Sequence, residues 1–153
     1  MKILVLSDSH GSLSTLEKVL IKESDAATVV HLGDGADEMR LMQPLNPVTP
    51  VITVRGNCDP RDPERKEEHI CTLAGKRFFF CHGHTCHVKT GLYTLWLKGK
   101  QNDCDVCLYG HTHQQHCTKE DGILLFNPGA VCRGEYGILT ADENGVNAVH
   151  KTI

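Results

Sequence analysis

Short apolar runs, separated by polar turns, alternate with amphipathic stretches in the first half of the chain and become paired runs in the second half. Apolar or β-branched runs of about four to eight residues indicate strands, and an apolar repeat every three or four residues indicates a helix. The pattern predicts strands at 2–7, 27–32, 51–55, 69–73, 76–81, 106–109, 114–118, 123–126, 136–140 and 146–153, and helices at 14–24, 36–43 and 88–98.

Two local features refine this pattern. Ser14 and Glu17 have the spacing of a capping box, so we expect them to begin the first helix. Trp96 lies on the apolar side of the third helix, where we expect a core anchor rather than a substrate platform. Alternating strands and helices followed by hairpins predict a mixed sheet system with helices outside.

The length and composition fit one globular unit. The chain has 153 residues, 40% of them hydrophobic and 23% charged, which is enough for a single domain over residues 1–153. The net charge is −3, so neither nucleic acid nor a membrane surface is an indicated partner. The apolar run at residues 3–6 is too short for a signal peptide. We therefore expect a cytoplasmic protein and leave open whether it forms a homo-oligomer.

Eight cysteines raise the question of disulfides or a metal knuckle. Without a secretion signal we expect free thiols, most of them small buried residues. Cys104 and Cys107 have the spacing of a zinc-ligand pair, but the sequence holds no matching second pair. On a strand their side chains would also point to opposite faces, which disfavours a chelate.

The most informative polar stretch is Gly110-His111-Thr112-His113, directly after the predicted strand at 106–109. Histidines at i and i+2 of an extended segment point the same way. Imidazole is a common ligand of divalent transition metals, so the pair is a candidate metal ligand. The alternative is two surface histidines on a loop.

Four other predicted strands also end in Asp, Asn or His. In open α/β sheets, sites form beyond the carboxyl ends of strands. One ion cannot use seven such ligands and leave room for substrate, whereas two ions sharing a carboxylate can. Pairs of ions about 3.5–4 Å apart hydrolyse phosphate esters. The candidate ligands and catalytic residues are Asp8, His10, Asp34, Asn57, His82, His111 and His113.

These motifs carry a family resemblance that covers nearly the whole chain. They are Asp8-x-His10, Gly33-Asp34, Gly56-Asn57-Cys58-Asp59, His82-Gly83-His84, Gly110-His111-Thr112-His113 and the late Asn127-Pro128-Gly129. Their order and spacing resemble the calcineurin-like metallophosphoesterases, above all the small bacterial and archaeal phosphodiesterases. The resemblance implies an α/β fold, a four-layer α-β-β-α sandwich of two mixed sheets flanked by helices.

The resemblance also implies roles for the candidate residues. Asp8, His10, Asp34 and His113 would hold a first ion. The second would be held by Asp34, Asn57, His82 and His111. Asp34 would bridge the two ions, and a bridging hydroxide would be the nucleophile.

Two further residues have open roles. His84, like Asn57, is a candidate for substrate binding, with structural filler as its alternative. Arg133 is either a phosphate ligand or an ordinary surface arginine. The remaining histidines, to which we assign no role, are His31, His69, His87, His116 and His150.

Cys58 is the departure from the wider family pattern. Larger phosphatases usually have a histidine there, thought to protonate the leaving group with help from the adjacent acid. A neutral thiol is a poor proton donor to an alkoxide leaving group. Cys58 therefore argues against broad, efficient hydrolysis of phosphate monoesters and favours esters with good leaving groups.

We therefore expect a metal-dependent phosphodiesterase acting on a small phosphoester. The alternatives are a non-catalytic protein-binding scaffold of the same fold and a nucleotide or protein phosphatase. The ligand set suits two divalent ions, Mn²⁺ first, with Fe²⁺, Zn²⁺, Ni²⁺ or Co²⁺ as other candidates. Because the set contains no thiolate, we expect no strong preference for zinc.

Overall fold

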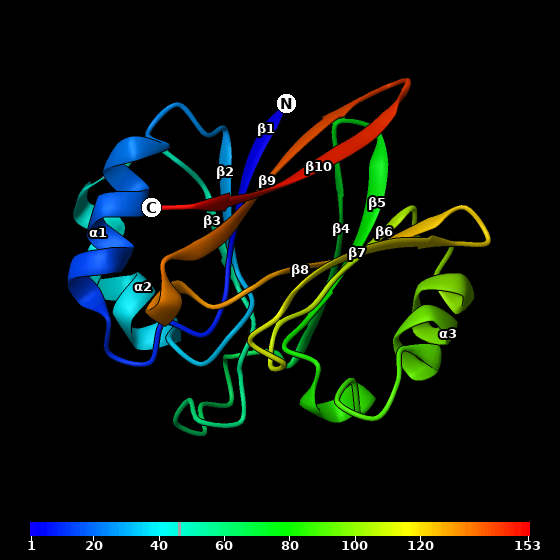
Figure 1. Cartoon of the computed structure of the whole chain (residues 1–153), viewed down its shortest axis with the longest axis horizontal. Helices are drawn as coiled ribbons and strands as arrows, with labels where there is room; N and C mark the ends of the chain where they lie inside the picture. The colour runs from blue at the N-terminus through cyan, green and yellow to red at the C-terminus, as the bar shows by residue number, and fades with distance from the viewer. Residues whose placement is uncertain (46) are drawn as a thin grey trace.

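The computed structural model describes residues 1–45 and 47–153, and its strands form two facing five-stranded sheets (Figure 1). Sheet A has the order β10-β9-β1-β2-β3 and sheet B the order β4-β5-β6-β8-β7. Within sheet A, β1, β2 and β3 are parallel, and within sheet B β5, β6 and β8 are parallel, while the other pairings are antiparallel. The strands are β1 (Lys2–Leu6), β2 (Thr28–His31), β3 (Val51–Thr53), β4 (Glu68–Leu73), β5 (Lys76–Cys81), β6 (Val106–Leu108), β7 (Gln115–Glu120), β8 (Ile123–Pro128), β9 (Glu135–Asp142) and β10 (Gly145–Thr152).

Three α-helices of the described residues cover the outer faces of the sheets. Helices α1 (Leu13–Lys22) and α2 (Ala36–Met42) lie on sheet A, and α3 (Tyr93–Gln101) lies on sheet B (Figure 1). The predicted four-layer sandwich of two mixed sheets is confirmed. In the described part of the chain, no helix is both long and apolar enough to span a membrane.

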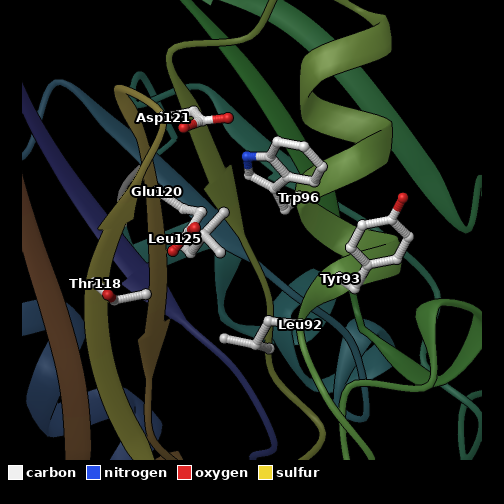
Figure 2. Close-up of a pocket in the computed structure, with 7 residues that line it drawn as sticks. All are labelled: Leu92, Tyr93, Trp96, Thr118, Glu120, Asp121 and Leu125. Carbon is white, nitrogen blue, oxygen red and sulfur yellow. The ribbon is translucent and has the colours of Figure 1, made fainter.

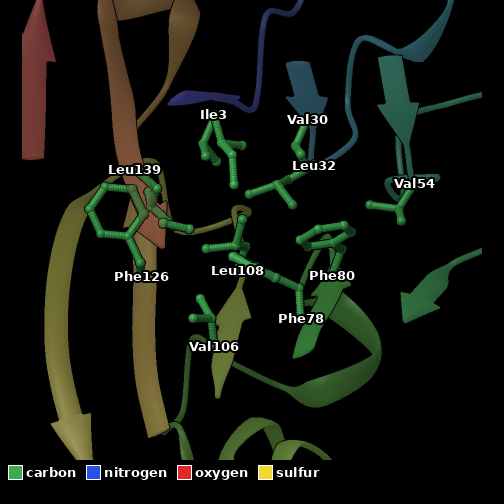
Figure 3. Packing of buried hydrophobic residues seen from close by; sticks show 12 residues of the cluster. Ile3, Val30, Leu32, Val54, Phe78, Phe80, Val106, Leu108, Phe126 and Leu139 are labelled. Carbon is green, nitrogen blue, oxygen red and sulfur yellow. The ribbon is translucent and has the colours of Figure 1, made fainter. Parts of the chain in front are cut away.

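Alternation along the strands explains the layers. Successive side chains of a strand point to opposite faces, so a strand covered on both faces is apolar throughout. In β1, Ile3 and Val5 enter the cluster between the sheets, where Figure 3 shows Ile3. Leu4 and Leu6 instead pack under α1. The cluster between the sheets also takes side chains from sheet B, including Phe78, Phe80, Val106, Leu108 and Phe126.

The outer clusters hold the helices in place. Leu16, Val19 and Leu20 of α1 are buried against sheet A. On the other side, Leu95 of α3 is buried against sheet B, and Trp96 is partly buried in the same cluster. The prediction of Trp96 as a core anchor therefore holds for its contact with sheet B.

Two predicted helix starts are wrong. The third helix begins at Tyr93 rather than 88, because a short 3₁₀ turn at His84–Cys86 and positive φ angles at His87 (53°) and Gly91 (157°) interrupt the helical path. The first helix begins at Leu13 after the N-cap residue Ser12, and no side chain caps it. The capping box predicted from Ser14 and Glu17 is therefore absent from this helix.

Candidate metal centre

The loops after β1, β2, β3, β5 and β6 meet at the carboxyl ends of the parallel strands. They place six of the seven predicted ligands in two adjacent groups of metal-ligating atoms, Asp8 with His10 and His113, and Asp34 with His82 and His111. Within each group the ligand atoms lie within 4.8 Å of one another. Both sheets contribute, so the site lies at the seam of the sandwich.

The first group is compact. Asp8 Oδ1 lies 3.0 Å from His113 Nε2 and 3.6 Å from His10 Nε2. The two imidazoles approach at 3.1 Å between their Nε2 atoms. Three potential ligand atoms therefore face one point.

The second group lies directly beside the first. His82 Nε2 is 3.2 Å from Asp34 Oδ2, and the His82 and His111 ring centroids are 5.0 Å apart. Asp34 Oδ2 is also 3.8 Å from His10 Nε2, which belongs to the first group. Asp34 thus stands between the groups, where a bridging ligand has to be.

Two buried atoms test whether divalent ions fit here. Within residues 1–45 and 47–153, Asp8 Oδ1 and His82 Nε2 have no hydrogen-bond partner, and the approach of His113 Nε2 to Asp8 Oδ1 lacks hydrogen-bond geometry. A buried polar atom without a partner costs about 1–3 kcal/mol. Carboxylate oxygens and imidazole nitrogens are suitable donors for such ions. The donor set and its orphaned atoms therefore fit bound divalent metal.

The opposite atom of each of these side chains is anchored. Asp8 Oδ2 accepts hydrogen bonds from Ser7 Oγ at 2.5 Å and from the His111 N–H at 3.1 Å. His82 Nδ1 donates to the Leu32 carbonyl at 2.8 Å, which leaves the Nε2 lone pair directed into the site when the ring is neutral. Such partners orient metal ligands and fix the imidazole tautomer.

Burial and neighbouring charges set the protonation of the second group. Burial and the charge of His82 lower the pKa of His111 to about 4, so that imidazole is neutral. Burial would raise the pKa of the Asp34 carboxyl, but His82 and the Cys58 N–H lower it below its usual range. Burial opposes protonation of His82, yet Asp34 and Asp8 raise the pKa of its ring. A bound ion would replace that proton, because a ligating imidazole must be neutral.

The backbone of the site is strained. Asp8, His10, Asp34, His111 and His113 all have positive φ, between 42° and 68°. Left-handed conformations of non-glycine residues cost of order 1–3 kcal/mol and cluster at functional sites. The prediction that the histidine pair lies on an extended segment is wrong. The left-handed turn instead sends the two imidazoles into different groups.

Two glycines of the motifs are needed for close approach. A Cβ at Gly56 would lie 2.0 Å from Asp34 Oδ1. At Gly110 it would lie 1.9 Å from Ser7 Oγ and 2.8 Å from Asp8 Oδ2. Any side chain at either position would displace a carboxylate of the centre or its anchor.

Asp59 organises the site, a role that sequence reasoning missed. Its carboxylate accepts four backbone N–H groups at 2.8–3.0 Å, from Asp34, Gly35, Ala36 and Gly56. These bonds tie the loop after β3 to the loop after β2. The motif showed an acid beside Cys58, but its partners lie more than twenty residues away in the chain, except Gly56.

His31, to which we assigned no role, belongs to a second supporting network. It is fully buried, and burial lowers its pKa to about 4. Its Nδ1 accepts the Gly33 N–H at 3.2 Å, so its Nε2 carries the proton and donates to Ser9 Oγ at 3.2 Å. Ser9 donates to Glu38, which also accepts the Gly11 N–H at 2.7 Å. The network holds the segment on which His10 lies.

Asn127 supports the other end of the site. Its amide nitrogen donates to the Gly110 carbonyl and to Thr112 Oγ1, both at 3.0 Å, so it holds the turn that carries the histidine pair. His150 in turn donates to the Asn127 carbonyl at 2.8 Å. Asn127 and Pro128 are the last two residues of β8.

The remaining predicted site residues lie at the rim. Asn57 is exposed and its amide donates to Cys58 Sγ at 3.4 Å; its assignment to the second ion stays a prediction. The His84 ring centroid lies 5.5 Å from that of His82. Arg133 donates to the His113 carbonyl at 3.0 Å, which places its guanidinium beside the first group.

An apolar groove of about 400 Å³ lies elsewhere, between α3 and the β7–β8 hairpin (Figure 2). It is lined by Leu92, Tyr93, Trp96, Thr118, Glu120, Asp121 and Leu125. None of the predicted ligands lines it, so it is separate from the candidate metal centre. The eight cysteines are free thiols, and Cys104 and Cys107 are buried under α3 outside both ligand groups.

The two-sheet sandwich with aspartates and histidines at the strand ends defines a metallophosphoesterase class of protein. The chain belongs to the calcineurin-like phosphoesterase superfamily, whose domain model matches residues 1–144. It is 32% identical over 178 residues to the phosphodiesterase YfcE of Escherichia coli K12, covering 98% of this chain and 93% of that protein.

Solved structures share the fold. A conserved Streptococcus pneumoniae protein described as a predicted phosphoesterase matches with a TM-score of 0.79 at 25% identity, covering 99% of this chain and 88% of that one. Vps29 from Entamoeba histolytica matches with a TM-score of 0.78 at 18% identity, covering 100% and 99%. The latter likeness concerns the fold alone.

Proposed function

We propose that this protein is a phosphodiesterase whose centre binds two divalent transition-metal ions, with Mn²⁺ as the working metal. The observation that carries the proposal is the pair of adjacent ligand groups with Asp34 between them. Kinship with YfcE, a phosphodiesterase by name, supports the choice of reaction.

We propose the ligand roles that the family resemblance implies, and the two ligand groups support six of them. Asp8, His10, Asp34 and His113 would hold one ion. Asp34, His82, His111 and Asn57 would hold the other. When bound, such a pair of ions supplies hydroxide at neutral pH and positive charge toward the phosphoryl oxygens.

The chain itself contributes orientation rather than acid catalysis. Cys58 occupies the position of the usual acid, and Asp59 is engaged by four backbone N–H groups and cannot orient a neighbouring acid. A leaving group must then depart without a proton from this loop. Since a positioned general acid is worth about 10²–10⁴-fold, diesters with acidic leaving groups such as aryl alcohols are the favoured substrates.

The test is hydrolysis of bis-p-nitrophenyl phosphate by native protein, chelator-treated protein and Asp34→Asn. We expect activity that needs added Mn²⁺, rises through neutral pH and disappears with chelator. Asp34→Asn should lower the affinity for both ions together, as measured by mass spectrometry of metal content. Asp121→Asn, on the exposed β7–β8 turn, is the matched control.

Two outcomes would contradict the proposal, and a third would contradict the bridging role of Asp34. Chelator-resistant hydrolysis would indicate another mechanism. A native protein that binds no metal and cleaves no phosphoester would indicate a scaffold. An Asp34→Asn variant with two tightly bound ions and full activity would contradict the bridging role.

A further inference from the structure

A pocket rich in arginine lies beside the metal centre, and the proposed reaction gives it no role. Its volume is about 420 Å³, and it is lined by Arg55, Arg61, Asp62, Pro63, Arg65 and Glu67. Three guanidinium groups and two carboxylates leave its wall with an excess of one positive charge. Guanidinium groups bind phosphate oxygens through paired N–H donors, so this wall is suited to a phosphate group.

Side-chain contacts connect the pocket with the second ligand group. Glu67 forms an ion pair with Arg55, and Glu67 Oε1 lies 3.6 Å from His84 Nε2. The His84 ring centroid lies 5.5 Å from that of His82 and 6.2 Å from that of His111. The pocket and the second ligand group therefore meet at His84.

The path of the chain also keeps the pocket close to the centre. Arg55 directly precedes Gly56 and Asn57 in the loop after β3, and its N–H donates to the Lys66 carbonyl at 2.8 Å. Residues 60–67 are thereby folded back against the strand end that carries the predicted ligand Asn57. An anion in the pocket would lie beside a substrate at the metal centre.

Two of the three guanidinium groups have hydrogen-bond donors left for an anion. Arg65 pairs with Asp37, and its Nε lies 3.6 Å from Asp62 Oδ2. Its buried Nη1 nevertheless has no hydrogen-bond partner among the described residues. Arg61 is exposed, and its guanidinium forms no ion pair within residues 1–45 and 47–153.

The third guanidinium group is neutralised by Glu67. In this ion pair the Arg55 side chain is 17% exposed and the Glu67 side chain 40%, so the carboxylate is the more exposed partner. Removing its charge would make Arg55 available to an anion and would remove a repulsive charge from the wall. Loss of Arg61 and loss of the Glu67 charge should therefore change phosphate affinity in opposite directions.

We propose that this arginine pocket binds a second phosphate group of the substrate. The preferred substrates are then phosphodiesters that carry a further phosphate away from the scissile bond, and Arg61 is a residue that determines this specificity. The inference rests on the proposed phosphodiesterase activity. No bond is made or broken in the pocket, which contributes binding alone.

The test compares two diesters with the same nitrophenolate leaving group, thymidine 5′-(p-nitrophenyl phosphate) and its 3′-phosphorylated form, in the presence of Mn²⁺. Native protein should show a lower KM for the phosphorylated diester at similar kcat, because the second phosphate adds binding without changing the leaving group. Arg61→Gln should raise that KM about tenfold, since a hydrogen bond to a charged group contributes roughly this factor. It should leave the other diester unchanged.

Two further variants complete the comparison. Glu67→Gln should lower the KM of the phosphorylated diester. Lys119→Gln removes one positive charge from an exposed position of β7, and this control should behave like native protein. All three variants should keep the native melting temperature.

A titration of inorganic phosphate into chelator-treated whole protein, followed by phosphorus NMR, measures the pocket without the ions. We expect binding by native protein and Lys119→Gln, weaker binding by Arg61→Gln and tighter binding by Glu67→Gln. Equal KM values for the two diesters in native protein, or an Arg61→Gln variant that matches Lys119→Gln, overturn the phosphate pocket but leave the phosphodiesterase standing. Hydrolysis of neither diester overturns both, even where inorganic phosphate still binds.

Discussion

Replacing Asp59 with asparagine measures what one carboxylate contributes to the architecture of the centre. Its Oδ2 accepts the N–H groups of Asp34 and Gly56, and its Oδ1 those of Gly35 and Ala36. Asparagine has one carbonyl oxygen, so its amide nitrogen would face two buried donors. Each buried donor without an acceptor costs about 1–3 kcal/mol, so the free energy of unfolding should fall by about 2–6 kcal/mol.

Urea unfolding of the metal-free protein, extrapolated linearly to water, gives this difference. Asp62→Asn is the control, because that carboxylate is partly exposed and accepts the Glu64 N–H within its own loop. Burial would raise the pKa of Asp59, but its four N–H donors lower it below the usual value. Its contribution is thus present above about pH 4 and is lost on further acidification. A loss below about 1 kcal/mol, or one equal to that of Asp62→Asn, would refute the reasoning.

Two further predictions concern single positions. Gly110→Ala should lower the affinity of the first ion, seen by calorimetric titration, because the new Cβ would overlap Ser7 Oγ and press on Asp8 Oδ2; unchanged binding of both ions would contradict it. His31 has a pKa of about 4 against 6.5 when unfolded, so the unfolded chain binds the extra proton between these values. Native protein should lose up to about 3 kcal/mol of stability as the pH falls from 6.5 to 4, and His31→Asn should lack this component in urea unfolding; parallel pH profiles would contradict it.

Much of the fold could be predicted because its signals are local. The consecutive apolar residues Phe78, Phe79 and Phe80 indicate a strand that is covered on both faces. In the structure, Phe78 and Phe80 point into the cluster between the sheets and Phe79 into the cluster under α3. The start of α3 could not be predicted, because the apolar spacing from Val88 onward fits a helix. What ends that path is the left-handed backbone at His87, which has no signal in hydrophobic periodicity.

The candidate site also has a part that the sequence could predict, the metal ligands, and a part that it could not, the residues that support them. Six of the candidate ligands follow strand ends directly, and this pattern was enough to predict from the sequence that they lie close together. The supports could not be predicted, since each is a tertiary hydrogen bond: Asp59 to the loop after β2, and His31 to Ser9. The place of the arginine pocket beside His84 likewise depends on how the loops after β3 and β5 approach each other.

Hydrogen bonds between the two sheets also make the geometry of the centre depend on both of them. His82 follows a strand of sheet B, yet its ring is anchored by the carbonyl of Leu32, which follows β2 of sheet A. Asp8 follows β1 of sheet A, yet the His111 N–H from the loop after β6 of sheet B holds one of its oxygens. Each sheet thus orients a ligand of the other, and the distances between the ligand groups depend on how the two sheets pack. Because a packed core resists small shifts, the apolar cluster between the sheets keeps Asp8 Oδ1 and His82 Nε2 at their separation of 3.9 Å, even though neither atom has a hydrogen-bond partner in the described part of the chain.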